Sequence, residues 1–574
     1  MITKYIYNKV LGLAVAALTL VACTDTWDDH YNGASTGVLE GSLWDAIQKD
    51  ANLSNFASVV QACGYDKSLA SSQVFTVFAP TNDAFTKEEA DALIASYNQQ
   101  KGKVNDDENT TIKEFLQNHI ALYNYSTSSK SNDSIVLMNG KYAILKSGQI
   151  DNTPLTSNNK LYGNGVLFTV GSKVNYFANV FEYLRKDSEL DSVAGFFYNS
   201  MFYRREFQPE KSVEGGIVDG KTIYLDSVFV QQNDLFDNDF LKARLNSEDS
   251  VYWMVVPTNE VWSELVDEYK EYFNYDNTVE DRDSLYYTNT RMAIMKGTAF
   301  SRTINTDKML QDSAMSTNAV MYYTSRRYTW GADSLHYFQY FNPMQAGGVL
   351  TGSTNVECSN GLILKSNDWP FDKRETFFQT RIIEAESQGA IQDVSKVERV
   401  QGSDTIQAET VTPQTRYVES NNAFYNKVSN NGFVEFEPSV TTVNHSVTFN
   451  ITNVLSNIGY DIYLVTAPAL ANDSNATEIQ RLPTIVRCTL GFHNQQGADQ
   501  TDQVVSSYTT NPDIVDYIKI AEDYKFPVCS YGLEEENAQV TLKVETRVSS
   551  TQQRNNTHTR TMRIDCIILK PHEE

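Results

Sequence analysis

Three blocks of sequence occur twice, in the same order, in the N-terminal part of this 574-residue chain. Each copy opens with a helical pattern of apolar residues, continues with a β run that ends in a proline turn, and closes with Asn-Gly before another β run. The blocks are 42–50, 75–85 and 164–170 in the first repeat (residues 41–175), and 180–187, 252–262 and 360–365 in the second repeat (residues 178–372). The chain therefore holds two copies of one kind of domain.

The polar residues of these blocks have physical roles that predict a structural scaffold. Pro80 fixes φ after a buried strand, and the side chains of Thr81 and Asn82 can satisfy amides of a loop or a helix start. Asn-Gly before a strand is turn chemistry. His119 lies in an apolar pattern, which predicts a hydrogen-bonded core histidine rather than a ligand.

The blocks resemble the signatures of the fasciclin domain, an adhesion and interaction module. Residues 76–85 match its first signature, 164–170 resemble its second, and Asn118-His119-Ile120 fits the position between them. In the second repeat we align Arg291-Met292-Ala293 with His119, and an insertion separates its opening helix from its first β block. The resemblance implies two α+β domains, the second divergent.

Beyond residue 380 the pattern changes to alternating or β-branched runs separated by polar loops. The clearest runs are 434–436, 446–451, 460–465, 483–488, 539–544 and 562–569. This spacing predicts an all-β sandwich over residues 380–574. The opening run, 381–386, and the closing run, 563–569, resemble the first and last strands of a galactose-binding-like jelly roll, a fold that many carbohydrate-binding modules share.

The N-terminus has the features of a secretion signal. Lys4 and Lys9 lead into an apolar run that is too short to span a bilayer as a helix, and Leu20-Val21-Ala22-Cys23 resembles the lipobox of bacterial lipoproteins. We expect loss of residues 1–22, acylation of Cys23, and an acidic tether over residues 23–40. Acidic residues behind the cysteine resemble the surface-export signal of Bacteroidetes-type lipoproteins. This predicts an outer-membrane location facing the cell exterior.

The net charge of −25 restricts the possible partners. No basic stripe is present to bind nucleic acid, and an acidic body does not dock on an anionic membrane by charge. The acylated Cys23 must then supply the anchor.

The five other cysteines lack CxxC spacing and accompanying histidine clusters, so we expect no zinc, and we predict no cofactor. Buried free thiols are the prediction, with one disulfide left open among Cys488, Cys529 and Cys566.

Two strings match catalytic or nucleotide-binding patterns by letter only. Residues 33–37 fit GxSxG, but no strand precedes them to form a nucleophile elbow. Residues 215–222 fit the phosphate-loop pattern, but polar residues precede them and a strand pattern follows, which predicts a hairpin turn. We therefore predict a non-catalytic protein.

An aromatic stretch in the second repeat is the candidate binding site, because aromatic rings stack on apolar sugar faces and anchor protein interfaces. Its candidate residues are Tyr322, Tyr323, Tyr328 and Trp330. A buried β-hairpin explains the same stretch. The loops of the predicted sandwich are a second possible site.

Asp followed by Ser or Thr and an aliphatic residue resembles the O-glycosylation sequon of exported Bacteroidetes proteins. The candidate acceptors are Ser134, Ser284, Ser334 and Thr405. A polar turn that enters a strand has the same three letters, so we expect some of these triplets to be buried.

These observations predict a non-catalytic, lipid-anchored surface protein that captures a glycan or another nutrient beside a SusC/SusD-like transporter. The alternative is a cell-surface adhesion or protein-interaction protein. An enzyme would need converging carboxylates, which a sequence does not reveal.

Overall fold

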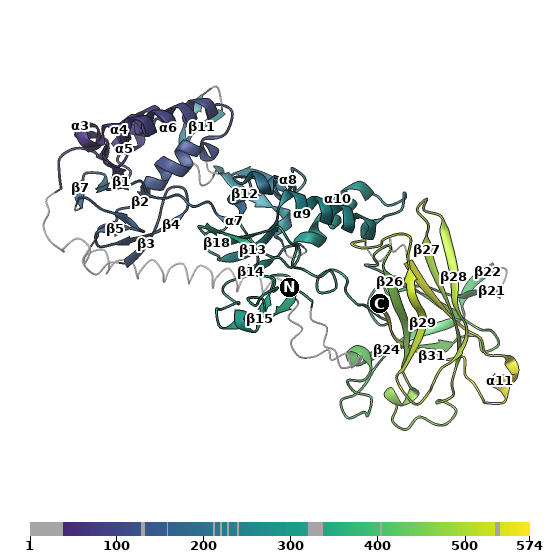
Figure 1. The fold of residues 1–574 in the computed structure, drawn as a ribbon. Coiled ribbons are helices and arrows are strands. Elements are labelled where there is room, and N and C mark those ends of the chain that lie inside the picture. The colour runs from purple at the N-terminus through teal and green to yellow at the C-terminus, as the bar shows by residue number, and fades with distance from the viewer. Residues whose placement is uncertain are drawn as a thin grey trace, which may run out of the picture. The chain divides into compact units, whose positions relative to one another are not determined.

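The structure is a computed structural model that describes residues 38–127, 132–157, 159–209, 213–218, 221–226, 229–237, 240–319, 337–401, 404–533 and 540–573. It divides into two units, one ending at Phe177 and the other beginning at Ala178 (Figure 1). Within these ranges, no helix combines the length and the apolar character that are needed to cross a bilayer.

The first unit contains the first repeat, whose central sheet has the strand order β2-β1-β8-β7. The two inner strands, β1 (Phe75–Pro80) and β8 (Gly165–Val170), run parallel and are buried at every position. Its other strands and α-helices are β2 (Ile120–Leu122), β7 (Lys160–Tyr162), α3 (Leu43–Lys49), α4 (Ser54–Ala62), α5 (Asp66–Ala70), α6 (Lys87–Gln100) and a small sheet of β3 (Asn132–Val136), β4 (Tyr142–Lys146), β5 (Gln149–Ile150) and β6 (Thr153–Pro154).

The second repeat has the same topology. Its sheet order is β14-β13-β18-β17, and β13 (Tyr252–Pro257) pairs in parallel with β18 (Gly361–Ser366). Its other main elements are α7 (Val180–Tyr183), α8 (Asp191–Phe197), α9 (Asn259–Tyr269), α10 (Arg282–Met295), β14 (Ala299–Ser301), β15 (Ser313–Met315), β16 (Gln339–Phe341) and β17 (Thr354–Cys358).

The insertion that distinguishes the second repeat forms antiparallel hairpins. Strands β9 (Tyr203–Phe207) and β12 (Phe229–Asn233) pair with each other, and so do β10 (Val213–Val218) and β11 (Lys221–Asp226). Residues 215–218 and 221–222 of the phosphate-loop-like string lie in this antiparallel pair, which confirms the predicted hairpin strands, and residues 219–220 lie outside the described residues.

The Asn-Gly block has the same structural role in both repeats. The side-chain oxygen of Asn164 accepts from Leu43 N (2.8 Å) at the start of α3, and that of Asn360 accepts from Val180 N (2.8 Å) at the start of α7. The following glycines have φ of 146° and 142°. A Cβ at Gly165 or Gly361 would lie 1.9 or 1.8 Å from a carbonyl oxygen of the adjacent strand, so only glycine fits.

The asparagine of the proline-turn block caps a helix elsewhere in the chain. Asn82 Oδ1 accepts from Asn55 N (3.1 Å) in the first turn of α4, and Asn259 Oδ1 accepts from Ser192 N (2.8 Å) in the first turn of α8. The predicted capping role of Asn82 is confirmed. The block thus fixes a distant helix against the end of the buried strand.

The alignment of Arg291-Met292-Ala293 with His119 was wrong. His119 directly precedes β2, whose Ile120 pairs with Val77 of β1. In the second repeat, Ala299 of β14 pairs with Met254 of β13, so the counterpart of His119 is Thr298. The residue type at this position differs between the repeats, so only strand register identifies it.

The C-terminal region forms two antiparallel sheets around one core. One has the order β23-β24-β31-β26-β29, with β19 also paired to β31, and the other has the order β20-β25-β30-β27-β28. The strands are β19 (Arg381–Glu384), β20 (Ile391–Val394), β23 (Val411–Tyr417), β24 (Gly432–Pro438), β25 (Ser446–Ile451), β26 (Gly459–Thr466), β27 (Ile485–His493), β28 (Asp499–Thr509), β29 (Asp516–Lys525), β30 (Val540–Thr546) and β31 (Met562–Pro571). The hairpin β21 (Lys396–Gln401)–β22 (Asp404–Glu409) forms its own two-stranded sheet, and a short helix α11 (Ser550–Arg554) precedes β31.

The second repeat and this double sheet share a single apolar core. Around the contact, Tyr275 Oη donates to Tyr531 O (2.7 Å), Cys529 N donates to Asn274 O (2.8 Å), and Ser456 Oγ donates to Glu271 O (2.7 Å). Apolar packing and main-chain hydrogen bonds together join the two parts into one unit.

No disulfide joins the cysteines of the described residues. The prediction of burial is confirmed for Cys63, Cys488, Cys529 and Cys566, whereas Cys358 is only half-buried. Burial raises the pKa of the Cys63, Cys488 and Cys529 thiols to about 12, which makes them poor nucleophiles.

Candidate functional site

All of the predicted binding and anchoring residues, and one of the four predicted O-glycosylation acceptors, lie outside the described residues. These are Cys23, Tyr322, Tyr323, Tyr328, Trp330 and Ser334. The three candidate acceptors that are described differ in exposure: Ser134 in β3 and Thr405 in β22 are exposed, whereas Ser284 in the first turn of α10 is half-buried.

His119 is a core residue, as predicted. It is fully buried, its Nδ1 lies 2.7 Å from Phe115 O, and its Nε2 accepts from Val174 N (3.0 Å). Burial lowers its pKa to about 4, so the ring is neutral at physiological pH. This histidine ties the segment after β8 to the sheet and is not available to a ligand.

The outer surface of the sheet that contains β19, β31, β26 and β29 presents two tyrosines over an apolar floor. The register aligns Ile382, Ile568, Tyr463 and Lys519 in one row across the strands, and Glu384, Cys566, Val465 and Tyr517 in the next. We call these eight residues the tyrosine face. The cluster of Val465, Cys566 and Ile568, with Ile382 and Tyr463 packed against it, is separate from the inner core.

Both tyrosines of this face are accessible. Tyr517 is 39% exposed and Tyr463 is half-buried, whereas their cross-strand neighbours Val465 and Ile568 are buried. Tyr517 and Tyr463 lie diagonally across neighbouring strands, within reach of one another. Burial, and then the nearby Cys566 and Asp565, raise the pKa of Tyr517 to about 12, so its hydroxyl remains a neutral hydrogen-bond donor.

Charged groups flank the tyrosines. Lys519 Nζ lies 5.7 Å from the centroid of the Tyr463 ring, 3.1 Å from Asp461 Oδ2 and 2.9 Å from Glu522 Oε1. Burial favours a raised pKa for Asp461, but hydrogen bonds involving His572, Asp523 N and Lys519 hold this pKa below its usual range. The charges beside the rings are therefore fixed and mutually paired.

A buried acidic cluster lies at one end of the tyrosine face. Glu384, Asp565 and Cys566 bring one potential ligand atom each to within 4.8 Å of one another. Asp565 accepts from Ser429 N (3.1 Å to each oxygen), and Glu384 accepts from Ser429 Oγ (2.7 Å).

Burial raises the pKa of Asp565 well above its usual range, opposed by the bond from Ser429 and assisted by Glu384 and Glu386. A hard cation such as Ca²⁺, which prefers carboxylate and carbonyl oxygens, would relieve this cost. The Cys566 thiol, whose pKa burial raises, is unsuited to a thiolate role.

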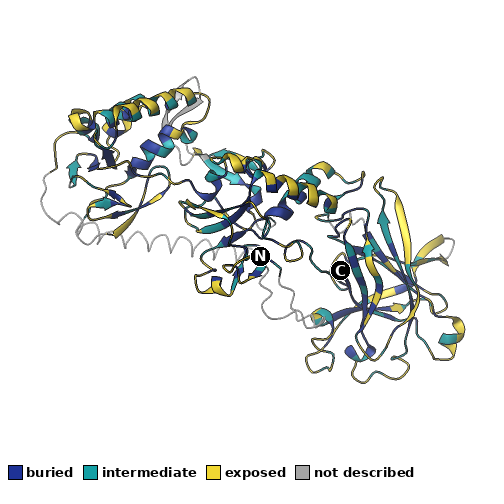
Figure 2. Cartoon of the chain, in the orientation of Figure 1, coloured by how far each residue is buried: buried dark blue, intermediate teal, exposed yellow. Residues whose placement is uncertain are grey.

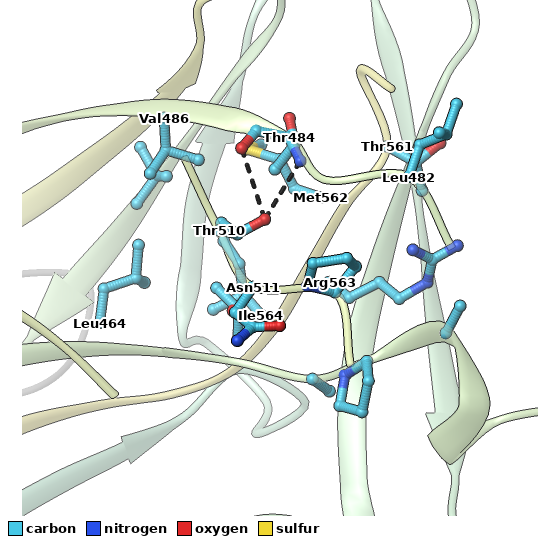
Figure 3. A pocket seen from close by; sticks show the side chains of 16 residues that line it. Leu464, Leu482, Thr484, Val486, Thr510, Asn511, Thr561, Met562, Arg563 and Ile564 are labelled. Carbon is cyan, nitrogen blue, oxygen red and sulfur yellow. Dashed lines mark hydrogen bonds between the residues drawn. The ribbon is translucent and has the colours of Figure 1, made fainter. Parts of the chain in front are cut away.

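The cavities within the double sheet are small. The space lined by Leu464, Thr484, Thr510 and Arg563 at one end of the sheets leaves about 20 Å³ free (Figure 3), which accommodates about one water molecule. A second space of about 110 Å³ beside Glu384 and Asn450 is also smaller than an ordinary ligand pocket. The small size of these two spaces favours a ligand site on an outer surface of the described strands.

The outer surface of the opposite sheet differs in chemistry. Its exposed or half-buried positions in β30 and β27 include Lys543, Glu545, Arg487 and Thr489, and Glu545 lies 3.1 Å from Arg547. Strand β28 is exposed along most of its length (Figure 2). This surface is polar and charged, and it lacks the apolar floor of the tyrosine face.

The sequence reasoning missed Tyr463 and Tyr517. The run 460–465 was recognised as a strand, but nothing indicated which of its sides faces solvent. The alternation of 516–521 was an available signal for β29, since Tyr517, Lys519 and Ala521 alternate with apolar residues. Only the register between β26 and β29 brings the two tyrosines onto neighbouring strands.

Comparison with known proteins identifies one domain. The fasciclin domain model matches residues 51–174, so this part of the first repeat is a fasciclin domain. No curated protein matches the chain. Among solved structures, the chain is similar to the CBM22-1 xylan-binding domain of Paenibacillus barcinonensis Xyn10C (11% identity over 34% of this chain and 94% of that one, TM-score 0.20). It is also similar to a FAS1 domain pair from the insect cell adhesion molecule Fasciclin I (12% identity over 56% of this chain and 98% of that one, TM-score 0.19).

Proposed function

We propose that this protein is a non-catalytic binding protein that captures glycans on the tyrosine face of a C-terminal, jelly-roll-like β-sandwich. The observation that carries the proposal is the pair Tyr463 and Tyr517, accessible above a buried apolar floor. Aromatic rings offer apolar surface to the C–H faces of sugars, and a phenol adds a hydrogen bond at low entropic cost.

The rest of the chain fits a display function. Acylated Cys23 anchors the protein to the outer membrane, facing the cell exterior, and the acidic segment over residues 23–40 is the tether. The two repeats stand between the tether and the sandwich in chain order. A SusC/SusD-like transporter is the partner that would receive the captured nutrient. Ser134 and Thr405, which are exposed, are the better O-glycosylation acceptors.

The test is affinity gel electrophoresis of the soluble chain, with Cys23 replaced by Ala, through gels that contain soluble polysaccharides. We expect Tyr517→Ala and Tyr463→Ala each to weaken retardation about tenfold, about 1.4 kcal/mol. The matched control is Tyr417→Ala, because Tyr417 is 69% exposed but lies in β23, at the opposite edge of the same sheet. Equal losses in all three variants, or retardation by no polysaccharide, would contradict the proposal.

A second candidate function, adhesion through the fasciclin domain, is favoured by Tyr123. This residue is 70% exposed and holds a left-handed φ of 77°, a costly conformation for an aromatic residue. Tyr142 and Val136, paired across β4 and β3, are exposed as well. Beads coated with the protein should aggregate or adhere to cells, and Tyr123→Ala should reduce this, whereas Tyr517→Ala should not.

A further inference from the structure

The charges around the tyrosine face restrict the class of glycan that it can bind, an inference that rests on the function proposed above. A glycan with uronate or sulfate groups needs cations that are free to pair with them. A neutral glycan needs only aromatic surface and hydrogen-bonding groups. Lys519 of β29 and Lys570 of β31, which lie beside Asp461, bear on the choice between these classes.

Both lysines already have carboxylate partners. Lys519 lies between Asp461 (3.1 Å) and Glu522 (2.9 Å), and these hydrogen bonds raise its pKa. Lys570, which pairs with Asp461 in register, has Glu573 at 2.8 Å. Asp461 in turn lies 2.7 Å from His572 Nδ1.

The carboxylates of this surface at least balance its lysines. Three carboxylates, those of Asp461, Glu522 and Glu573, pair with the two ammonium groups of Lys519 and Lys570. The whole chain carries a net charge of −25. An approaching polyanion therefore meets a repulsive field and must also displace a carboxylate from each lysine.

We infer that the tyrosine face selects neutral glycans and rejects anionic ones, because carboxylates of the same surface occupy its lysines. Lys519 then serves to position the Tyr463 ring, above which its ammonium group lies, and does not bind substrate charge. The selection is built from Asp461 and Glu522, so removing these charges should change the class of glycan bound.

The experiment uses the soluble full chain in gels that contain a neutral polysaccharide (galactomannan or mixed-linkage glucan) or an anionic one (polygalacturonate or chondroitin sulfate), at low salt. We expect the unsubstituted chain to be retarded only by a neutral polymer. The double variant Asp461→Asn/Glu522→Gln should keep that retardation and gain retardation by an anionic polymer. The gain should disappear at about 0.5 M salt, where screening shortens electrostatic range to a few ångströms.

Asp461 also accepts a hydrogen bond from Asp523 N, so its substitution can disturb the backbone. The single variant Glu522→Gln avoids this, because Glu522 is 66% exposed. It should give a smaller gain in the same direction. Retardation of the unsubstituted chain by an anionic polymer would overturn the inference while leaving glycan capture in place. Neutral binding with no gain in either variant would also overturn it. Binding to neither class would instead remove the proposed function itself.

Discussion

The two repeats share a scaffold and differ in how their cores end. Both have a four-stranded sheet with the same strand order, an Asn-Gly pair at equivalent positions, and an asparagine that caps a distant helix. In the first repeat, His119 and Asn118 bind the segment after β8 through hydrogen bonds with the backbone of Val174. The apolar cluster around them contains only residues of the first repeat. In the second repeat, the core continues into the double sheet.

The difference shows that the repeated blocks specify the sheet, whereas other residues decide whether the domain is independent. Thr298 stands where His119 would be, and its hydroxyl donates only to the nearby Met295 O (2.8 Å). The residues between α9 and α10 instead contact the double sheet, with Phe273 and Tyr531 rings 5.6 Å apart. The second repeat therefore needs the double sheet to complete its core.

The largest effect that distinguishes the repeats should come from their equivalent glycines. Gly165→Ala and Gly361→Ala each place a Cβ within 2 Å of a carbonyl oxygen, at a φ that L-residues rarely adopt. Each substitution should therefore lower the free energy of unfolding by more than about 3 kcal/mol. Calorimetry should show that Gly165→Ala lowers only the transition of the first unit. Gly361→Ala should lower that of the second repeat and the double sheet together.

The control for these variants is Gly195→Ala, since Gly195 lies in α8 with no atom within 4 Å of an added Cβ. It should be neutral or slightly stabilising. Separate transitions for the second repeat and the double sheet in Gly361→Ala would show that their shared core does not couple them.

Acid should destabilise each unit through one buried neutral histidine. Burial lowers the pKa of His119 to about 4, and burial together with Arg560 lowers that of His445 to about 4. Above pH 6.5 each histidine is neutral in both the folded and the unfolded chain, so its protonation does not change the free energy of unfolding. As the pH falls from 6.5 towards 4, the unfolded chain binds the proton first, so the free energy of unfolding decreases, by about 3 kcal/mol per histidine at most.

Melting temperatures measured from pH 8 to pH 4.5 check this. His119→Gln should flatten the pH dependence of the first unit and leave that of the second unchanged, and His445→Gln should do the reverse. Parallel pH curves for His119→Gln and the unsubstituted chain would exclude the buried histidine as the cause.

The acidic cluster should make only the second unit sensitive to divalent cations. Calcium should raise its melting temperature, because the ion offsets the burial of Asp565 and Glu384. In EDTA, Asp565→Asn should be neutral or stabilising by about 1 kcal/mol, since an amide cannot ionise in this buried site, and it should abolish the response to calcium. An equal calcium response in the variant would place the cation elsewhere.

A smaller effect should come from the contact between the second repeat and the double sheet. Tyr275→Phe removes the 2.7 Å hydrogen bonds that the Tyr275 hydroxyl makes with the carbonyl of Tyr531 and the side-chain amide of Asn289. This loss should lower the free energy of unfolding by about 1–3 kcal/mol. Tyr508→Phe is the control, since Tyr508 is 37% exposed and its bonds to Asp516 are long, at 3.4 Å. Similar melting temperatures for both variants would mean that the contact contributes little.

Local chemistry explains which parts of this fold were predictable. The Pro-Thr-Asn and Asn-Gly blocks revealed both sheets, because their turn and capping roles depend on a few residues whose types are nearly obligatory. Most C-terminal strands were also recognisable from alternation. The equivalence of His119 and Thr298, the shared core, and the meeting of Tyr463 with Tyr517 were not predictable, because each depends on the register between strands far apart in the chain.

We expect ligand capture to belong to the second unit and not to the fasciclin domain. Residues 38–177 and residues 178–574 can be expressed separately and run side by side in gels that contain a neutral polysaccharide. We expect residues 178–574 to be retarded as strongly as the full chain and to lose this retardation with Tyr463→Ala/Tyr517→Ala, while residues 38–177 migrate freely. Retardation of residues 38–177 with none for residues 178–574, both folded by circular dichroism, would contradict it.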